Sequence, residues 1–165
     1  MKVKKINISY EEYLEDEKLL SSDMDLVEEA VDALSGSYAP YSEFHVGAAL
    51  LLSNGKIVRG SNQENAANPS GLCAERVALF HASSEYPEQT VVSLAITGKS
   101  DHFTTTEPIT PCGSCRQVIA ETEKKQGSEI RVIMKGEKGI TRIVEGIDSL
   151  LPMVFHEEKL KKSKK

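Results

Sequence analysis

Apolar residues recur along the chain with a helical period in some stretches and a strand period in others. From Ser22 they return every three or four positions, which predicts a helix that Ser22 caps and Ser35-Gly36 ends. The residues at this spacing are Leu26, Val27, Ala30, Val31 and Leu34. Residues 44–52 are instead apolar on both alternations, which predicts a strand covered on both of its faces.

Further along, apolar and β-branched runs alternate with segments of helical spacing. The expected strands cover residues 44–52, 57–62, 91–97, 130–134 and 139–144, and further helices cover 72–81 and 112–125. Residues 3–8 are expected to form a short strand or an arm, and residues 147–160 a short helix or an arm. The order predicts an α/β fold, a three-layer αβα sandwich on a five-stranded mixed sheet.

Length and composition place this sandwich in one domain. The chain has 165 residues, 39% of them hydrophobic and 27% charged, which is ordinary for a soluble globular protein. We expect an N-terminal extension or arm (1–21), the domain itself (22–160) and a basic tail (161–165). No apolar run approaches the ~20 residues of a membrane span, and no apolar stretch follows the N-terminal lysines, so the cytoplasm is the expected compartment. The net charge of −5 argues against nucleic acid as the main partner.

All three cysteines fall in two short motifs, Cys73-Ala74-Glu75 and Pro111-Cys112-Gly113-Ser114-Cys115. At a helix start, Cys112 and Cys115 present both sulfurs on one face, and Cys73 supplies a third thiolate. Three thiolates hold one zinc ion and leave its fourth position open for water, and the Glu75 carboxylate can move protons to and from that water. This combination is the signature of zinc deaminases.

Two other uses of these cysteines fit the sequence less well. A redox Cys-x-x-Cys pair leaves Cys73 and Glu75 without a role, and a closed structural zinc site needs a fourth cysteine or histidine. Among the histidines, none stands at ligand spacing to either motif; they are His45, His81, His102 and His156. Because Glu75 is two residues from Cys73, both reach one metal ion only if Cys73 lies where a loop becomes a helix.

Three thiolates and Zn²⁺ together carry a charge of −1, so an anionic centre needs nearby positive charge. Two helix N-termini directed at the sulfurs would supply part of it. Arg76 is the nearest cation in the sequence and is expected to donate a hydrogen bond to a thiolate. Taken alone, an arginine here would be a solvent-facing helix residue.

Beyond these two motifs, the chain resembles the small homotetrameric zinc-dependent cytidine deaminases of nucleoside salvage. The resemblance covers roughly residues 22 to 160. The matching stretches are Tyr38-Ala39-Pro40-Tyr41-Ser42, Phe44, Val46-Gly47-Ala48-Ala49-Leu50-Leu51, Gly60, Asn62, Glu64-Asn65-Ala66, Gly71-Leu72-Cys73-Ala74-Glu75-Arg76-Val77-Ala78, Pro111-Cys112-Gly113, Cys115-Arg116-Gln117-Val118, Leu150-Leu151-Pro152 and Phe155.

The resemblance implies hydrolysis of cytidine and deoxycytidine to uridine and deoxyuridine, with one zinc ion per subunit and Glu75 as proton carrier. It also implies that Asn62 and Glu64 hold the ribose hydroxyls and that Phe44 packs on the substrate. Ala74 would offer backbone contacts, and Phe155 would reach a neighbouring subunit's active site. Independently of the resemblance, a carboxylate in a sugar pocket accepts hydrogen bonds from hydroxyls and repels phosphate, which favours free nucleosides.

The register of the hairpin between the strands at 44–52 and 57–62 tests whether Phe44, Asn62 and Glu64 can line one pocket. A two-residue Asn54-Gly55 turn would place Phe44 on the opposite face from Asn62 and Glu64. A three-residue loop, Ser53-Asn54-Gly55 with Gly55 left-handed, places all three on one face, and we predict this loop. Two rival activities stay open: a deaminase of another aminopyrimidine nucleoside, such as a blasticidin-type antibiotic, and a non-catalytic structural zinc module.

Overall fold

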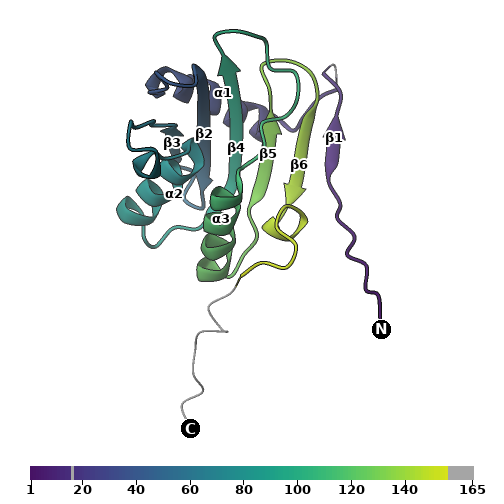
Figure 1. The fold of residues 1–165 in the computed structure, drawn as a ribbon. Helices are drawn as coiled ribbons and strands as arrows, with labels where there is room; N and C mark the ends of the chain where they lie inside the picture. Colours follow the sequence, from purple (N-terminus) through teal and green to yellow (C-terminus); the bar gives the residue numbers. More distant parts are fainter. Residues whose placement is uncertain (16, 156–165) are drawn as a thin grey trace.

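Six strands form the central layer of the computed structural model, which describes residues 1–15 and 17–155. The strands are β1 (Glu11–Tyr13), β2 (Phe44–Leu52), β3 (Ile57–Ser61), β4 (Val91–Ser100), β5 (Arg131–Lys135) and β6 (Thr141–Glu145). The helices are α1 (Ser21–Ala33), α2 (Ala74–Glu85) and α3 (Gly113–Gln126), with short 3₁₀ turns at η1 (Leu34–Gly36), η2 (Asn68–Ser70) and η3 (Ile147–Ser149). Helix α1 covers one face of the sheet, and α2 and α3 cover the other (Figure 1). This confirms the three-layer αβα sandwich.

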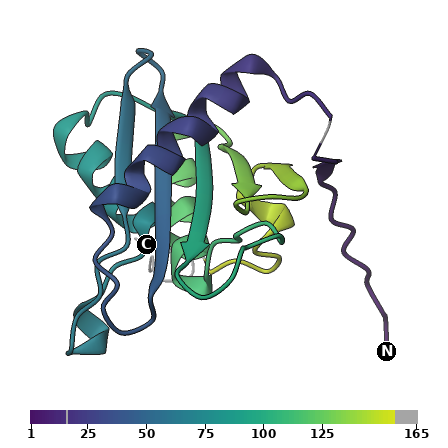
Figure 2. The same ribbon diagram turned by 90° about the horizontal axis from the view of Figure 1, so that it is seen from above.

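The strand order is β1-β6-β5-β4-β2-β3, and the sheet is mixed (Figure 1). Only β4 and β5 run parallel, and α3 makes the long crossover that a parallel pair requires. In the view from above, α1 runs obliquely across β2 and β4 (Figure 2). None of the described helices is long and apolar enough to cross a membrane.

Two apolar cores fill the spaces between the layers. Under α1, the helix residues Leu26, Val27 and Ala30 pack on inward-facing residues of β2, β4, β5 and β6. The larger core lies between the sheet and α2 and α3. Two glycines permit close packing: a Cβ on Gly47 would lie 2.0 Å from the Ala30 carbonyl oxygen in α1, and one on Gly60 would lie 2.5 Å from that of Ala74 in α2. A side chain at either position would push a helix off the sheet.

The hairpin between β2 and β3 has the predicted three-residue loop. Leu52 N–H donates to the Lys56 carbonyl at 2.9 Å, and Leu51 pairs with Ile57. Gly55 adopts a φ of 80°, in the left-handed region that glycine tolerates. The register is therefore the one that directs the two strand ends into a common pocket.

The prediction of a five-stranded sheet was one strand short, because β1 pairs with β6 at the sheet edge. Residues 3–8, predicted as a possible strand, contain none; the strand lies at the acidic Glu11–Tyr13 instead. Ion pairs explain its position, because Glu11 meets Arg131 at 3.3 Å and Glu12 meets Arg142 at 2.8 Å. A strand that is paired through charged side chains cannot be recognised from the pattern of apolar residues.

The start of α1 also differs from the prediction. The helix begins at Ser21 after Leu20, and no side chain caps it, so Ser22 is a residue of the first turn and not its cap. Val31, expected in the core, is 48% exposed. Within the described part of the 147–160 segment, only η3 is helical, and the 161–165 tail lies outside the described residues.

Candidate active site

The three cysteine sulfurs meet at the N-termini of two helices. Cys73 immediately precedes α2 and Cys112 immediately precedes α3, while Cys115 lies in the first turn of α3. The Cys73 and Cys112 sulfurs are 3.7 Å apart, the Cys112 and Cys115 sulfurs 3.5 Å apart, and all three lie within 4.8 Å of one another. Tetrahedral zinc with Zn–S bonds of about 2.3 Å places its sulfurs about 3.8 Å apart, so the cluster fits this ion.

The backbone around Cys73 explains how a cysteine and a glutamate two residues apart serve one centre. Gln63 and Leu72 exchange two backbone hydrogen bonds of 2.9 Å, which fixes the segment leading to Cys73. Cys73 has the extended φ and ψ of −73° and 154°, and the helix begins at Ala74. The predicted loop-to-helix junction at Cys73 is therefore present.

Positive charge surrounds the sulfurs as expected. Both helix N-termini face the cluster through Cys73 and Cys112, and the Arg76 Nη2 lies 3.7 Å from the Cys73 sulfur. Hydrogen bonds from Cys115 and then from Arg76 lower the pKa of Cys73 to about 5. Contact with Cys73, and then burial, raise the pKa of Cys115. In a metal-bound centre all three would be thiolates.

Glu75 is the buried acid of the site. Its side chain is only 4% exposed, although it borders the same cavity as Cys73 and Cys112. Desolvation by burial is the main reason that its pKa is raised above the ordinary range. A raised pKa makes the carboxyl group a better proton acceptor than an ordinary glutamate, which suits a group that must act as both general base and general acid.

The cavity beside the cluster has a volume of about 890 Å³, the size of a small-molecule site. Its wall contains the proposed substrate contacts Phe44, Asn62 and Glu64, as the hairpin register predicted. Glu64 accepts hydrogen bonds from the backbone N–H groups of Tyr41 and Ser42 at 2.9 and 3.3 Å. Together with the Ser42 hydroxyl, the largest cause, they lower the pKa of Glu64, so it is a carboxylate at neutral pH.

Two residues with expected substrate roles are not brought into this cavity. Ala74 is fully buried as the first residue of α2, and Phe155 is 54% exposed, where Gln117 Nε2 donates to its carbonyl oxygen at 3.1 Å. Phe155 instead lines a separate surface hollow with α2 and α3 residues. Their substrate roles stay predictions.

Arg116 is a structural contributor that sequence reasoning did not single out, although it lies beside Cys115. Its Nε donates to the Pro111 carbonyl oxygen at 2.8 Å, and its Nη1 donates to that of Leu150 at 2.6 Å. It therefore ties the loop before Cys112 to the C-terminal segment. Only the fold reveals this role, because residue 150 is remote in sequence.

We expect Arg76→Ala to weaken zinc retention about 10- to 100-fold, the usual effect of losing a group that supports a metal ligand. The reason is that Arg76 is the cation in contact with the Cys73 sulfur. Competition with a chromophoric chelator measures the affinity, and His81→Ala, at an exposed position of α2, is the control. Unchanged zinc affinity and turnover in Arg76→Ala would rule out this role.

A three-sulfur cluster with an adjoining buried carboxylate, in an αβα sandwich, defines the class of zinc-dependent deaminases. The comparisons with known proteins agree. The family described as "Cytidine and deoxycytidylate deaminase zinc-binding region" matches residues 20–127. The chain belongs to this family.

Individual relatives support the assignment. The chain is 49% identical over 96 residues to a cytidine deaminase of Halalkalibacterium halodurans, covering 58% of this chain and 68% of the relative. It is 38% identical over 135 residues to one of Sporosarcina psychrophila, covering 82% and 92%. A crystal structure of cytidine deaminase from Burkholderia pseudomallei superposes with a TM-score of 0.70 at 38% identity, covering 80% of this chain and 98% of that one.

Proposed function

We propose that the protein hydrolyses cytidine and deoxycytidine to uridine and deoxyuridine with release of ammonia, in cytoplasmic pyrimidine salvage. The observation that carries this proposal is the buried Glu75 beside the three-sulfur cluster, inside a cavity that Asn62 and Glu64 also line. The names of the relatives, cytidine deaminase, support the same substrate.

Cys73, Cys112 and Cys115 would hold one zinc ion, and no other group of three potential ligands occurs among the described residues. When bound, the ion supplies Lewis acidity that lowers the pKa of water and so provides the nucleophile. Glu75 would take one proton from this water and place it on the ring nitrogen N3, and would then pass the second proton of the water to the departing amine, which leaves as ammonia. Its burial excludes bulk water from these transfers.

The sugar half of the cavity favours a free nucleoside. Glu64 is a fixed carboxylate, so it accepts hydrogen bonds from ribose hydroxyls and repels phosphate groups. That argues against nucleotides and nucleic-acid strands as substrates. Asn62 and Glu64 suit the hydroxyls of an ordinary ribose, and a blasticidin-type nucleoside would not offer them these hydroxyls.

The homotetramer is part of the proposal. A half-exposed apolar surface on α2 and α3 supports it: Phe80 is 50% exposed and Phe155 54%, and both line one hollow with Leu79 and Val118. Exposed aromatic side chains gathered in this way are typical of contact surfaces. In such an assembly, Phe155 would complete the active site of a neighbouring subunit.

Zinc-loaded protein mixed with cytidine tests the function directly. We expect the ultraviolet absorbance of cytidine to change to that of uridine, with one ammonia released per nucleoside and one zinc ion per chain. Deoxycytidine should react comparably, whereas deoxycytidylate and a blasticidin-type antibiotic should react at least about tenfold more slowly, a modest discrimination for a missing or repelled group. Zinc-loaded protein without activity on cytidine would support the structural zinc module instead.

A further inference from the structure

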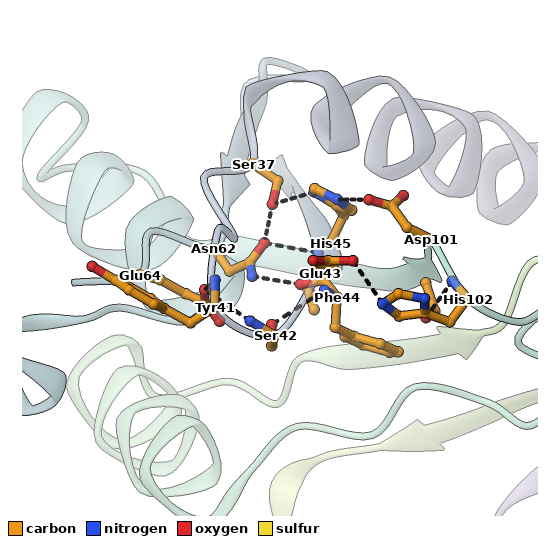
Figure 3. Close-up of polar contacts among 12 residues, drawn as sticks. Ser37, Tyr41, Ser42, Glu43, Phe44, His45, Asn62, Glu64, Asp101 and His102 are labelled. Carbon is orange, nitrogen blue, oxygen red and sulfur yellow. Dashed lines mark hydrogen bonds and ion pairs between the residues drawn. The ribbon is translucent and has the colours of Figure 1, made fainter. Parts of the chain in front are cut away.

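Ser37 contacts the sugar-binding side chain Asn62 from outside the cavity lining. It follows η1, and the next residue, Tyr38, joins the segment beyond β3: Tyr38 N–H donates to the Asn62 carbonyl at 2.9 Å, and Glu64 N–H donates to the Tyr38 carbonyl at 2.8 Å. This pairing brings the Ser37 hydroxyl within 2.5 Å of Asn62 Oδ1. Figure 3 shows the contacts continuing through His45 to Asp101.

Main-chain groups determine the orientation of the Asn62 side-chain amide, that is, which position Oδ1 occupies and which Nδ2 occupies. Val46 N–H can only donate and lies 2.8 Å from Oδ1, whereas the Phe44 carbonyl can only accept and lies 2.9 Å from Nδ2. Since Oδ1 can only accept, Ser37 must donate its single hydroxyl hydrogen to it. The orientation of Asn62 is thus assigned from its hydrogen-bond partners.

The same reasoning assigns His45. Because Ser37 has used its hydrogen, the His45 Nδ1, 3.0 Å from the Ser37 oxygen, must be the donor in that contact. The other ring nitrogen, Nε2, lies 3.4 Å from the Asp101 carboxylate. Along the contacts drawn in Figure 3, hydrogen atoms are therefore donated in one direction, from His45 to Ser37 and from Ser37 to Asn62.

One amide hydrogen of Asn62 then remains for the cavity. Oδ1 accepts from both Ser37 and Val46, and Nδ2 spends one hydrogen on Phe44. The second N–H has no acceptor among the described residues. Hydrogen bonds accepted at Oδ1 polarise the amide and make this N–H a stronger donor. They also hold the side chain in one conformation before a ligand arrives, which lowers the entropic cost of binding.

We propose that Ser37 and His45 are positioning residues of the sugar pocket, which hold and polarise Asn62 so that its free N–H donates to a ribose hydroxyl oxygen. The inference rests on the nucleoside function proposed above. A hydroxyl suits the pair because it accepts from Asn62 and donates to the Glu64 carboxylate. Neither Ser37 nor His45 lines the cavity, so both act through Asn62.

Steady-state kinetics on two substrates test the proposal, namely cytidine and 2′,3′-dideoxycytidine, which lacks the hydroxyls. Ser37→Ala should raise KM for cytidine about fivefold, the usual effect of losing one hydrogen bond, with kcat within about twofold. KM for the dideoxy analogue should stay unchanged. Ser37→Thr keeps the hydroxyl and should restore the KM for cytidine.

His45 provides a second matched pair of variants. His45→Leu removes the donor and should raise KM for cytidine about threefold, while His45→Asn presents an amide N–H near the position of Nδ1 and should recover most of it. The fold should survive all four changes, because Asn62 keeps its bonds to Phe44 and Val46.

The proposal is overturned if Ser37→Ala leaves both KM values unchanged, or if it weakens both substrates equally, which would indicate a general structural role. Calorimetric binding of uridine and 2′,3′-dideoxyuridine to the same variants separates this outcome from failure of the proposed function. Selective loss of uridine affinity would uphold the positioning role even if cytidine were not deaminated. Equal affinity of the wild type for both ligands would reject it.

Discussion

Replacing Glu75 with glutamine is expected to lower kcat for cytidine by about 10³-fold while zinc content stays at one per chain. Glutamine has nearly the shape of glutamate but cannot carry a proton between water, ring nitrogen and leaving amine. Among the residues that the structure describes, no other carboxylate is within reach of the three sulfurs to take over, and Glu75 itself is only 4% exposed. The absorbance assay and elemental analysis of the same sample measure the two quantities.

Glu85→Gln is the matched control, because it makes the same chemical change at the exposed far end of α2. It should leave kcat within about twofold, as a surface substitution does. A Glu75→Gln protein that keeps more than a tenth of wild-type kcat, with zinc bound, would exclude Glu75 as the proton carrier.

Cys112→Ser is expected to weaken zinc binding by more than about 100-fold, since even groups that only support a ligand are worth 10- to 100-fold. Turnover at equal zinc concentration should fall in proportion to occupancy. The fold should persist, because Cys112 is exposed whereas Cys115 is fully buried. Zinc titration followed by a competing chelator measures the affinity, and circular dichroism reports the fold.

Chelation of the wild-type protein is the companion experiment. Removing zinc should abolish activity, and adding it back should restore activity in the wild type, but in Cys112→Ser only at much higher zinc concentrations. If Cys112→Ser still bound one zinc ion after dialysis against a chelator, the three-thiolate centre would be wrong.

The metal motif could be predicted because its information is local. The spacing of Cys112 and Cys115, and the requirement that Cys73 lie at a helix start, follow from helix geometry alone. The hairpin register was predicted from the requirement that Phe44, Asn62 and Glu64 line one pocket, which the three-residue loop meets and the two-residue turn does not; Gly55 adopts the left-handed φ that this loop needs. The first prediction needed two short motifs read together, and the second needed the residues of one hairpin.

What could not be predicted depends on partners distant in sequence. Glu11 and Glu12 of β1 pair with Arg131 and Arg142, more than a hundred residues away, so the apolar pattern did not indicate the strand at this position. Ser37 and His45 had no motif of their own, and His45 counted only as an isolated histidine. Their connection to Asn62 arises because the segment after η1 pairs with the segment after β3.

Because two helix N-termini meet at one cluster, a bound metal ion would also stabilise the fold against unfolding. Cys73 and Cys112 are 39 positions apart, and the chain between them contains α2 and β4. A metal ion joining their sulfurs is a reversible cross-link across that loop, and a covalent link of this length would remove about 4 kcal/mol of unfolded-chain entropy. A bound ion would therefore join the start of α2 to the start of α3. The free energy of unfolding should then increase with the concentration of available zinc.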